Sequence, residues 1–315
     1  MIPAFDIDLA QKKAELAILK TLIYFDIFNY PLSEKDIKNF LGCYISDEIF
    51  AAALVQLLLD KTIFRVGEFY SLQNNRQRAE ERLLGSVRAE PLLAKAGKIG
   101  AFLYKFPYVR AVAVSGSLSK NYADKKADID FFVITKANRL WVARSILHLF
   151  KKLTFLVGKQ NFFCMNYFVD EEALTIPEKN IYTAVEIVTL LPVAGTFTMN
   201  KFSEKNGWTK MWFPHYEHKR NLKTAEKGSG LKKFAEWFFN GSTGQKLDKF
   251  LYKWTTSRWK KKEQHGQKNS KGKVMNLVTG KHFSKSNPEA FQEQILTRYN
   301  DKVAWYFNYH PHYFD

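Results

Sequence analysis

Two carboxylates stand two residues apart at the start of an apolar segment. Residues 111–135 have the sequence AVAVSGSLSKNYADKKADIDFFVIT, in which Asp128 and Asp130 introduce the second apolar run. Alternate side chains of a strand project from the same face, so these two would lie together. Like charges this close raise each other's pKa and destabilise a fold. Mg²⁺ relieves such repulsion, because it prefers oxygen ligands such as carboxylates and substrate phosphates. The spacing therefore predicts a Mg²⁺ site.

A glycine and a serine precede the carboxylates. Gly116 and Ser117 end the first apolar run and open a polar segment. A glycine lets a phosphate approach the backbone closely, and the following N–H groups and hydroxyl can donate hydrogen bonds to it. A phosphate-binding turn beside a metal site favours phosphoryl chemistry on a nucleotide. The alternative is an ordinary turn beside a solvated strand edge, and the apolar flanks AVAV and FFVIT disfavour it.

The spacing of these residues resembles a known signature. The segment GSLSKNYADKKADIDFFV has Gly-Ser, ten further residues, and then Asp-apolar-Asp in an apolar strand. It resembles the motif of the DNA polymerase β-like nucleotidyltransferase superfamily, particularly its minimal and aminoglycoside-type members. The resemblance implies a nucleotidyltransferase that moves a nucleoside monophosphate from a nucleoside triphosphate, such as ATP, to an acceptor hydroxyl. It also implies that Asp128 and Asp130 are the catalytic ligands of Mg²⁺.

The same resemblance implies which residues hold the nucleotide. Lys120 stands where these enzymes usually have a basic residue, and Asn121 stands where they often have glycine. Asparagine tolerates the left-handed backbone conformation nearly as well as glycine does. The implied nucleotide-binding residues are Gly116, Ser117, Ser119, Lys120 and Asn166.

The third carboxylate that this family normally carries on a neighbouring strand is not evident. The candidate strand NFFCMNYFVD offers Asn166, which cannot act as a base, and Asp170, which we expect to lie past the sheet. Glu186, on the next predicted helix, could reach the site, although a local polar contact explains it equally well. A looser resemblance to bacterial nucleotidyltransferase-like proteins adds Asn206 and Trp208 as candidates. The alternative function is a catalytically inactive nucleotide- or nucleic-acid-binding module of the same fold.

The N-terminal residues predict a winged helix-turn-helix-like domain over residues 1–75. Apolar residues at helical spacing over 11–28 are followed by helices that Ser33 and Ser46 would cap, and then by two short strands around a glycine. The third helix carries acids and no Lys or Arg up to residue 60, so it would repel DNA phosphates. We therefore interpret this domain as a packing or partner module, with a DNA-binding regulator as the alternative.

The middle of the chain predicts an α+β nucleotidyltransferase domain over residues 106–195, reached through a helical connector over 76–105 that Pro91 breaks. The predicted elements after the motif are a helix over 138–156, a strand over 161–170, and a helix that starts near Pro177 and stops at Pro192.

The C-terminal region, residues 196–315, predicts a helical basic tail. The predicted helices cover 228–240, 244–262 and 287–308, with a flexible loop over 260–285. Residues 251–285 hold ten Lys and Arg against one acid, with Trp254 and Trp259 among them. Basic residues interleaved with aromatics can bind nucleic acid by tracking phosphates and stacking bases. The alternative is that Trp254 packs in the core and the lysines are solvated.

Composition limits the class of protein. A chain of 315 residues with 46% apolar residues can bury a sizeable core, and the net charge of +17 favours anionic partners unless the source simply uses many lysines. Two cysteines make no disulfide framework, which fits a reducing cytoplasm. The N-terminus lacks the order of a signal peptide, and no apolar run approaches the roughly 18 residues that span a bilayer. We expect a cytoplasmic protein without membrane insertion, and pairing into a homo-oligomer is left open.

Overall fold

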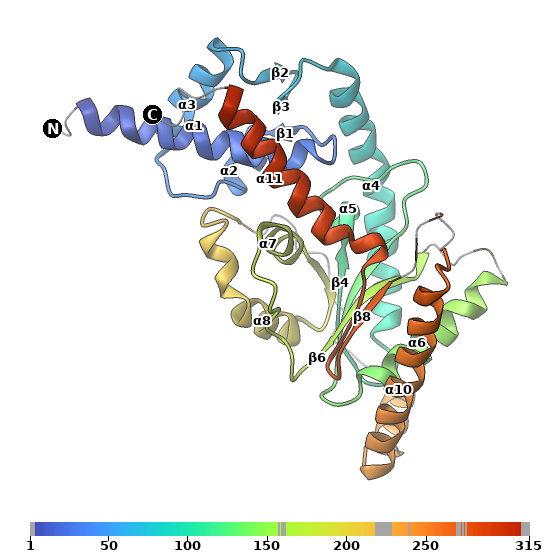
Figure 1. Ribbon diagram of the computed structural model, residues 1–315. Coiled ribbons are helices and arrows are strands. Elements are labelled where there is room, and N and C mark those ends of the chain that lie inside the picture. Colours follow the sequence, from blue (N-terminus) through green and yellow to red (C-terminus); the bar gives the residue numbers. More distant parts are fainter. Residues whose placement is uncertain are drawn as a thin grey trace.

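The computed structural model describes residues 4–156, 162–217, 229–238, 240–268 and 276–309, with the single residues 158, 272 and 274. The chain is α+β, as predicted: a six-stranded mixed sheet lies at its centre, a three-stranded sheet lies near the N-terminus, and helices surround both (Figure 1). Within this described part, no helix is both long enough and apolar enough to cross a membrane.

The N-terminal elements form as the capping residues predict. The hydroxyl of Ser33 accepts a hydrogen bond from the Asp36 N–H at 3.2 Å, and that of Ser46 accepts one from the Ile49 N–H at 3.4 Å. Each bond satisfies a backbone donor that a helix start leaves unpaired. The elements of this region are α1 (Ala4–Asp26), β1 (Leu32–Ser33), α2 (Glu34–Asn39), α3 (Asp47–Leu59), β2 (Phe64–Val66) and β3 (Phe69–Ser71).

The connector is one continuous helix, α4 (Arg76–Leu103), so the predicted break at Pro91 is wrong. Proline removes one backbone hydrogen bond from a helix interior and is usually destabilising there. Here Ala89 and Leu93, on either side of Pro91, are buried against the central sheet. Packing of this apolar face holds the helix together across the proline, as tertiary contacts commonly override local propensity.

The central sheet has the strand order β7-β4-β5-β6-β9-β8. β4 and β5 pair antiparallel, whereas β5 and β6 pair parallel and are connected through α6 (Leu140–Phe155). The strands are β4 (Val109–Ser115), β5 (Asp130–Thr135), β6 (Cys164–Asp170), β7 (Leu191–Ala194), β8 (Leu277–Thr279) and β9 (Phe283–Ser286).

The helix predicted from near Pro177 to Pro192 is shorter, and the residues at its predicted end belong to a strand. The helix α7 covers Ile181–Val188, with Asn180 as its cap, and Pro192 lies inside β7 rather than at a helix end. β7 is an edge of the sheet, where a residue without an N–H loses no ladder hydrogen bond. The apolar run TLLPVAG suits a buried strand as well as a helix, and periodicity alone does not separate the two.

The loop predicted over 260–285 is also corrected. β8 and β9 lie in it and extend the central sheet, because β9 pairs antiparallel with β6. Strands of three or four residues are too short to show the apolar alternation that marks a strand in the sequence. Residues 269–271, 273 and 275 of this stretch lie outside the described part of the chain.

Helices cover both faces of the central sheet. α4 and α6 pack on one face, and α7 and α8 (Thr196–Lys205) pack on the other. α7 also contacts the N-terminal helices, so it lies between them and the sheet. The last helix, α11 (Phe291–Tyr309), runs beside α1 (Figure 1). The remaining helices are α5 (Gly116–Ser119), η2 (Gly207–Met211), α9 (Gly230–Phe238), α10 (Ser242–Gln264) and η3 (Pro288–Ala290).

Candidate functional site

The turn after β4 brings its glycine directly against a carboxylate. Ser115 pairs with Asp130 at the end of the antiparallel β4–β5 ladder, and Gly116 follows with a φ of +69°. A Cβ on Gly116 would lie 2.8 Å from Oδ2 of Asp130. Only glycine suits this position, because other residues would meet both the left-handed backbone and the carboxylate. The missing side chain lets the Asp130 carboxylate lie directly against the turn.

The two carboxylates share one side of the strand, as the alternation predicts. Ile129 and Phe131 are fully buried in the core beneath α4 and α6. Asp128 and Asp130 instead line a chamber on the opposite face of the sheet. Successive side chains of this segment therefore lie alternately in the core and in the chamber.

The chamber has a volume of about 730 Å³ and is walled by segments that are distant in the sequence. Its polar wall is the β4–α5 turn with the two carboxylates, and aromatic rings supply much of the rest. Its lining includes Tyr24, Phe25, Phe28 and Tyr30 near the end of α1, Tyr182, Thr183 and Glu186 on α7, Phe202 on α8, and Lys285, Asn287, Phe291 and Gln292 near α11. Pockets of this size and mixed character are typical of small-molecule sites.

Asn166 lies beside Asp130, on the neighbouring strand where the third carboxylate was sought. Its Nδ2 donates a hydrogen bond to Oδ1 of Asp130 at 2.5 Å, and its Oδ1 accepts one from the Cys164 thiol at 3.2 Å. Burial raises the pKa of the Cys164 thiol to about 11, and the negative charge of Asp130 adds to the rise. Asn166 therefore positions Asp130, and Cys164 stays protonated near neutral pH.

Lys120 spans the turn and α7. Its Nζ donates to Oε1 of Glu186 at 2.7 Å and to the carbonyl of Gly116 at 3.1 Å. The sequence left open whether Glu186 reaches the site or makes a local polar contact. In the structure it lines the chamber and pairs with Lys120 there. Asn121 adopts a φ of +60°, which confirms the left-handed conformation predicted for it. The hydroxyl of Tyr30 donates to the Lys120 carbonyl.

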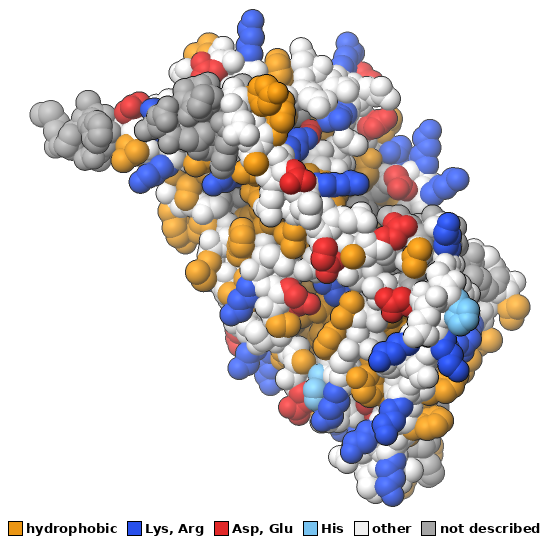
Figure 2. Space-filling model, viewed as in Figure 1, with side chains coloured by type: hydrophobic (Ala, Val, Ile, Leu, Met, Phe, Trp, Pro, Cys, Tyr) orange, Lys and Arg blue, Asp and Glu red, His pale blue; other side chains and the backbone are white. Residues whose placement is uncertain are grey.

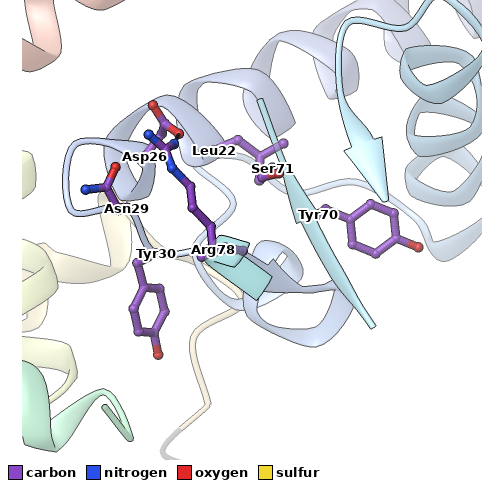
Figure 3. A pocket seen from close by; sticks show the side chains of 8 residues that line it. Leu22, Asp26, Asn29, Tyr30, Tyr70, Ser71 and Arg78 are labelled. Atoms are coloured by element: carbon purple, nitrogen blue, oxygen red, sulfur yellow. Dashed lines mark hydrogen bonds and ion pairs between the residues drawn. The ribbon is translucent and has the colours of Figure 1, made fainter. Parts of the chain in front are cut away.

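Tyr30 connects this turn to the N-terminal helices. In Figure 3 its ring points away from Asp26 and Arg78, which lie beside each other on the other side of the loop. The same ring lies over the guanidinium of Arg82, 4.2 Å from the carbon atom Cζ, and against the ring of Tyr122. The N-terminal region therefore holds the β4–α5 turn in place.

The serines of the turn differ in position. Ser117 is exposed and lines the chamber, as expected of a residue that donates a hydrogen bond to a phosphate. Ser119 does not line it, and its hydroxyl donates back to the Gly116 carbonyl at 2.9 Å. Ser119 thus stabilises the turn rather than facing a ligand.

Three other candidates lie away from the chamber. Asp170 is the last residue of β6 and is fully buried, so the expectation that it lies past the sheet is wrong. Its carboxylate accepts a hydrogen bond from the Asn138 N–H and lies 2.9 Å from Nδ1 of His282. β5 and β6 run parallel, and Asp130 and Asp170 stand at opposite ends of their ladder. Asn206 bonds the backbone of the Leu174–Ile176 loop, and Trp208 donates to Asn206.

Asp128 and Asp130 are the carboxylates available to a metal ion. Within the described part of the chain, no group of three or more His, Cys, Asp or Glu side chains could hold a metal. Two carboxylates with substrate phosphates suffice for Mg²⁺, which keeps several waters. Gly116 and both carboxylates line the chamber, so the donors present fit an oxygen-ligated Mg²⁺.

Several chamber residues carry no signal in the sequence. Tyr182 is partly buried, and the desolvation of its phenol together with the charges of Glu186 and Asp130 raises the phenol pKa well above its usual value. It therefore remains a neutral hydrogen-bond donor. Lys285 lies on β9, more than a hundred residues beyond the motif. Its position in the chamber follows from the strand order of the sheet, which the sequence alone did not reveal.

Part of the basic stretch for which nucleic-acid binding is predicted lies on the exposed face of α10. On α10, Trp254 is 51% exposed, so the alternative in which it packs in the core is wrong. Leu247 and Leu251 form the packed face of this helix. The guanidinium of Arg258 lies over the Trp254 ring, with Cζ 5.5 Å from its centroid. Figure 2 shows Lys and Arg side chains gathered at the end of the molecule where α10 lies.

Comparisons with protein-family models, with curated proteins and with solved structures found no match to this chain.

Proposed function

We propose that this protein is a Mg²⁺-dependent nucleotidyltransferase, which moves a nucleoside monophosphate from a nucleoside triphosphate to an acceptor hydroxyl and releases pyrophosphate. One observation carries the proposal: Gly116, held at a positive φ, lies against Asp130 in a chamber that Asp128 also lines. A close-approach glycine next to paired carboxylates suits a triphosphate with its metal.

The fold supports the same proposal. In its support, β4 and β5 are followed by a helix and the strand β6, which is the order strand, strand, helix, strand that the sequence predicts for this domain. We interpret α1 to β3, with three helices and a three-stranded sheet, as the winged-helix-like domain. Its third helix buries Phe50, Leu54 and Leu57 and begins with two acids, which favours packing over DNA binding.

The polar residues around the β4–α5 turn have distinct roles in this proposal. Ser117 and the backbone at Gly116 bind the triphosphate, and Asp128 and Asp130 hold Mg²⁺. When bound, Mg²⁺ would neutralise the charge of the phosphates and of the expelled pyrophosphate. Lys120 is kept beside the turn by Glu186 and can add a positive charge there. Asn166 keeps Asp130 oriented through its amide hydrogen bond.

Pyrophosphate release tests the proposal. We expect wild type to release pyrophosphate from one nucleoside triphosphate with Mg²⁺ when a suitable acceptor is present. Asp130→Asn should abolish release while keeping the fold, because it removes one of two like charges and keeps an acceptor for the Asn166 amide. Full activity of the folded Asp130→Asn variant would contradict the proposal.

A second candidate function follows from Asn166. An amide stands beside Asp130 where a carboxylate would otherwise assist catalysis, and Glu186 is engaged by Lys120. These contacts favour a nucleotide-binding module that has lost catalysis. This candidate predicts Mg²⁺-dependent nucleotide binding without pyrophosphate release for any acceptor, so the same assay, combined with a binding measurement, separates the two functions.

A further inference from the structure

We propose that the end of the chamber at Lys285 binds an anionic group, a carboxylate or a phosphate, carried by the acceptor molecule. This inference rests on the proposed function only in calling that molecule the acceptor. The anion site itself follows from the position of Lys285, from its partners, and from the rings between it and the carboxylates.

The sheet register places Lys285 away from the carboxylates on the same face. Phe132 pairs with Tyr167, and Tyr167 pairs with Lys285, so the three form a row across β5, β6 and β9. The rings of Phe132 and Tyr167 are in contact, with centroids 5.4 Å apart, and Nζ of Lys285 lies 5.6 Å from the Tyr167 centroid. Neighbouring strands are about 4.8 Å apart, so β9 lies roughly 10 Å from β5. A molecule about that long could touch both ends.

The charge of Lys285 is poorly compensated. Its ammonium donates to Oε1 of Gln292, and none of the ion pairs among the described residues includes Lys285. Burial lowers the pKa of Lys285. The negative charges of Glu178, Glu293 and Glu186, which form no ion pair with Lys285, partly offset this lowering of its pKa. A half-buried cation without an ion-pair partner is costly, and a bound anion would remove that cost.

Further polar atoms line the chamber. Asn287 and Gln292 line it, and Nδ2 of Asn287 donates a hydrogen bond to Oε2 of Glu293 at 3.2 Å. Thr183 also lines the chamber and is only 5% exposed, yet its hydroxyl has no hydrogen-bond partner among the described residues. Buried hydroxyls are normally paired, so an unpaired one is a candidate ligand contact.

The aromatic walls of the chamber favour a ligand whose middle part is flat and apolar. Phe132, Tyr167, Tyr182, Phe202 and Phe291 all line the chamber. Rings such as these pack edge-to-face or offset against another ring. The ligand that fits is therefore a hydroxyl-bearing aromatic compound with a carboxylate or phosphate at its far end.

Calorimetric titration with matched probes tests this site. The probes are 3-(4-hydroxyphenyl)propanoate with its primary amide, and 2-(4-hydroxyphenyl)ethyl phosphate with 2-(4-hydroxyphenyl)ethanol. We expect at least one anion to bind wild type about tenfold or more tightly than its neutral partner, the usual effect of a charged hydrogen bond. Lys285→Met should remove that preference, and Lys285→Arg should retain part of it. Lys281→Met, at an exposed lysine of the same hairpin, should have no effect.

The outcomes separate this inference from the proposed function. The inference is overturned if neither anion is preferred by wild type, or if the preference survives in a folded Lys285→Met variant. It is also overturned if Lys285→Met weakens binding of Mg²⁺-ATP instead, since Lys285 would then contact the triphosphate. If anion binding depends on Lys285 but no nucleotide binds with Mg²⁺, the anion site stands and the proposed function fails.

Discussion

Gly116 is the residue on which the geometry of the site depends most. Gly116→Ala should lower the free energy of unfolding by about 1–2 kcal/mol, because alanine disfavours the left-handed backbone, and the new Cβ would displace the Asp130 carboxylate. Chemical denaturation measures this change. The matched control is Gly97→Ala in α4, where a Cβ meets nothing within 4 Å and alanine should stabilise the helix. Equal effects of the two substitutions would contradict the account.

Asn166 lies where a third carboxylate would face the proposed metal site. Asn166→Asp should lower the free energy of unfolding by about 1.4 kcal/mol without Mg²⁺, the equivalent of one pKa unit of like-charge repulsion. With Mg²⁺ the same variant should gain more in melting temperature than wild type does, because it offers a third carboxylate. A scan of melting temperature against Mg²⁺ concentration checks both effects. An unchanged response to Mg²⁺ would separate Asn166 from the metal site.

Cys164 reports on the charge of Asp130. Because burial and Asp130 raise the pKa of its thiol to about 11, alkylation by iodoacetamide should stay slow at pH 8 and accelerate only as the pH approaches that value. Asp130→Asn should move the profile to lower pH, since it removes a negative charge that disfavours the thiolate. The measurement uses a Cys43→Ser background. Identical profiles with and without Asp130 would contradict this coupling.

At the residue scale, the sequence predicted the parts of the site that are close together in the chain. Alternation placed Asp128 and Asp130 on one face, and Asn121 adopts the predicted left-handed backbone. Ser119 was misplaced, because a four-residue helix turns its hydroxyl back to the Gly116 carbonyl. Lys285 was not identified at all, since it reaches the chamber only through the pairing of β9 with β6.

At the element scale, one buried carboxylate ties α1 to two other helices. Asp26 accepts from Arg78 of α4 at 2.8 Å and from Lys302 of α11 (Figure 3 shows the contact with Arg78). Asp26→Asn should lower the free energy of unfolding by about 2–3 kcal/mol, because two partly buried cations lose their carboxylate. Asp47→Asn, which breaks the exposed pair with Lys38, should change it by about 0.5 kcal/mol or less. Equal losses in urea denaturation would contradict the assignment.

Elements with strong local signals were predicted, and those that depend on long-range pairing were not. Ser33 and Ser46 marked helix starts that the structure confirms. Pro192 was taken as a helix stop, whereas it lies in an edge strand whose backbone needs no N–H there. Strand β9 is polar and short, so its pairing with β6 and β8 rather than its own sequence makes it a strand.

At the scale of the whole molecule, the chamber is the place where distant regions meet. α1 and the loop after it, the β4–α5 turn, α7 and the start of α11 all contribute side chains. The N-terminal helices and α11 share one apolar core with α7. This arrangement explains why a short motif predicted the metal and phosphate side of the site but not the aromatic side. The account therefore predicts that ligand binding stabilises the entire chain.

The most direct test of the account is the melting temperature with each nucleoside triphosphate, with and without Mg²⁺. Wild type should show a Mg²⁺-dependent rise with at least one triphosphate, because a ligand of the native state stabilises it. The Asp128→Asn/Asp130→Asn variant should keep its fold and lose that rise. A rise of equal size in the variant, or no rise in wild type with any triphosphate at high concentration, would contradict the assignment of these carboxylates to a metal and a nucleotide.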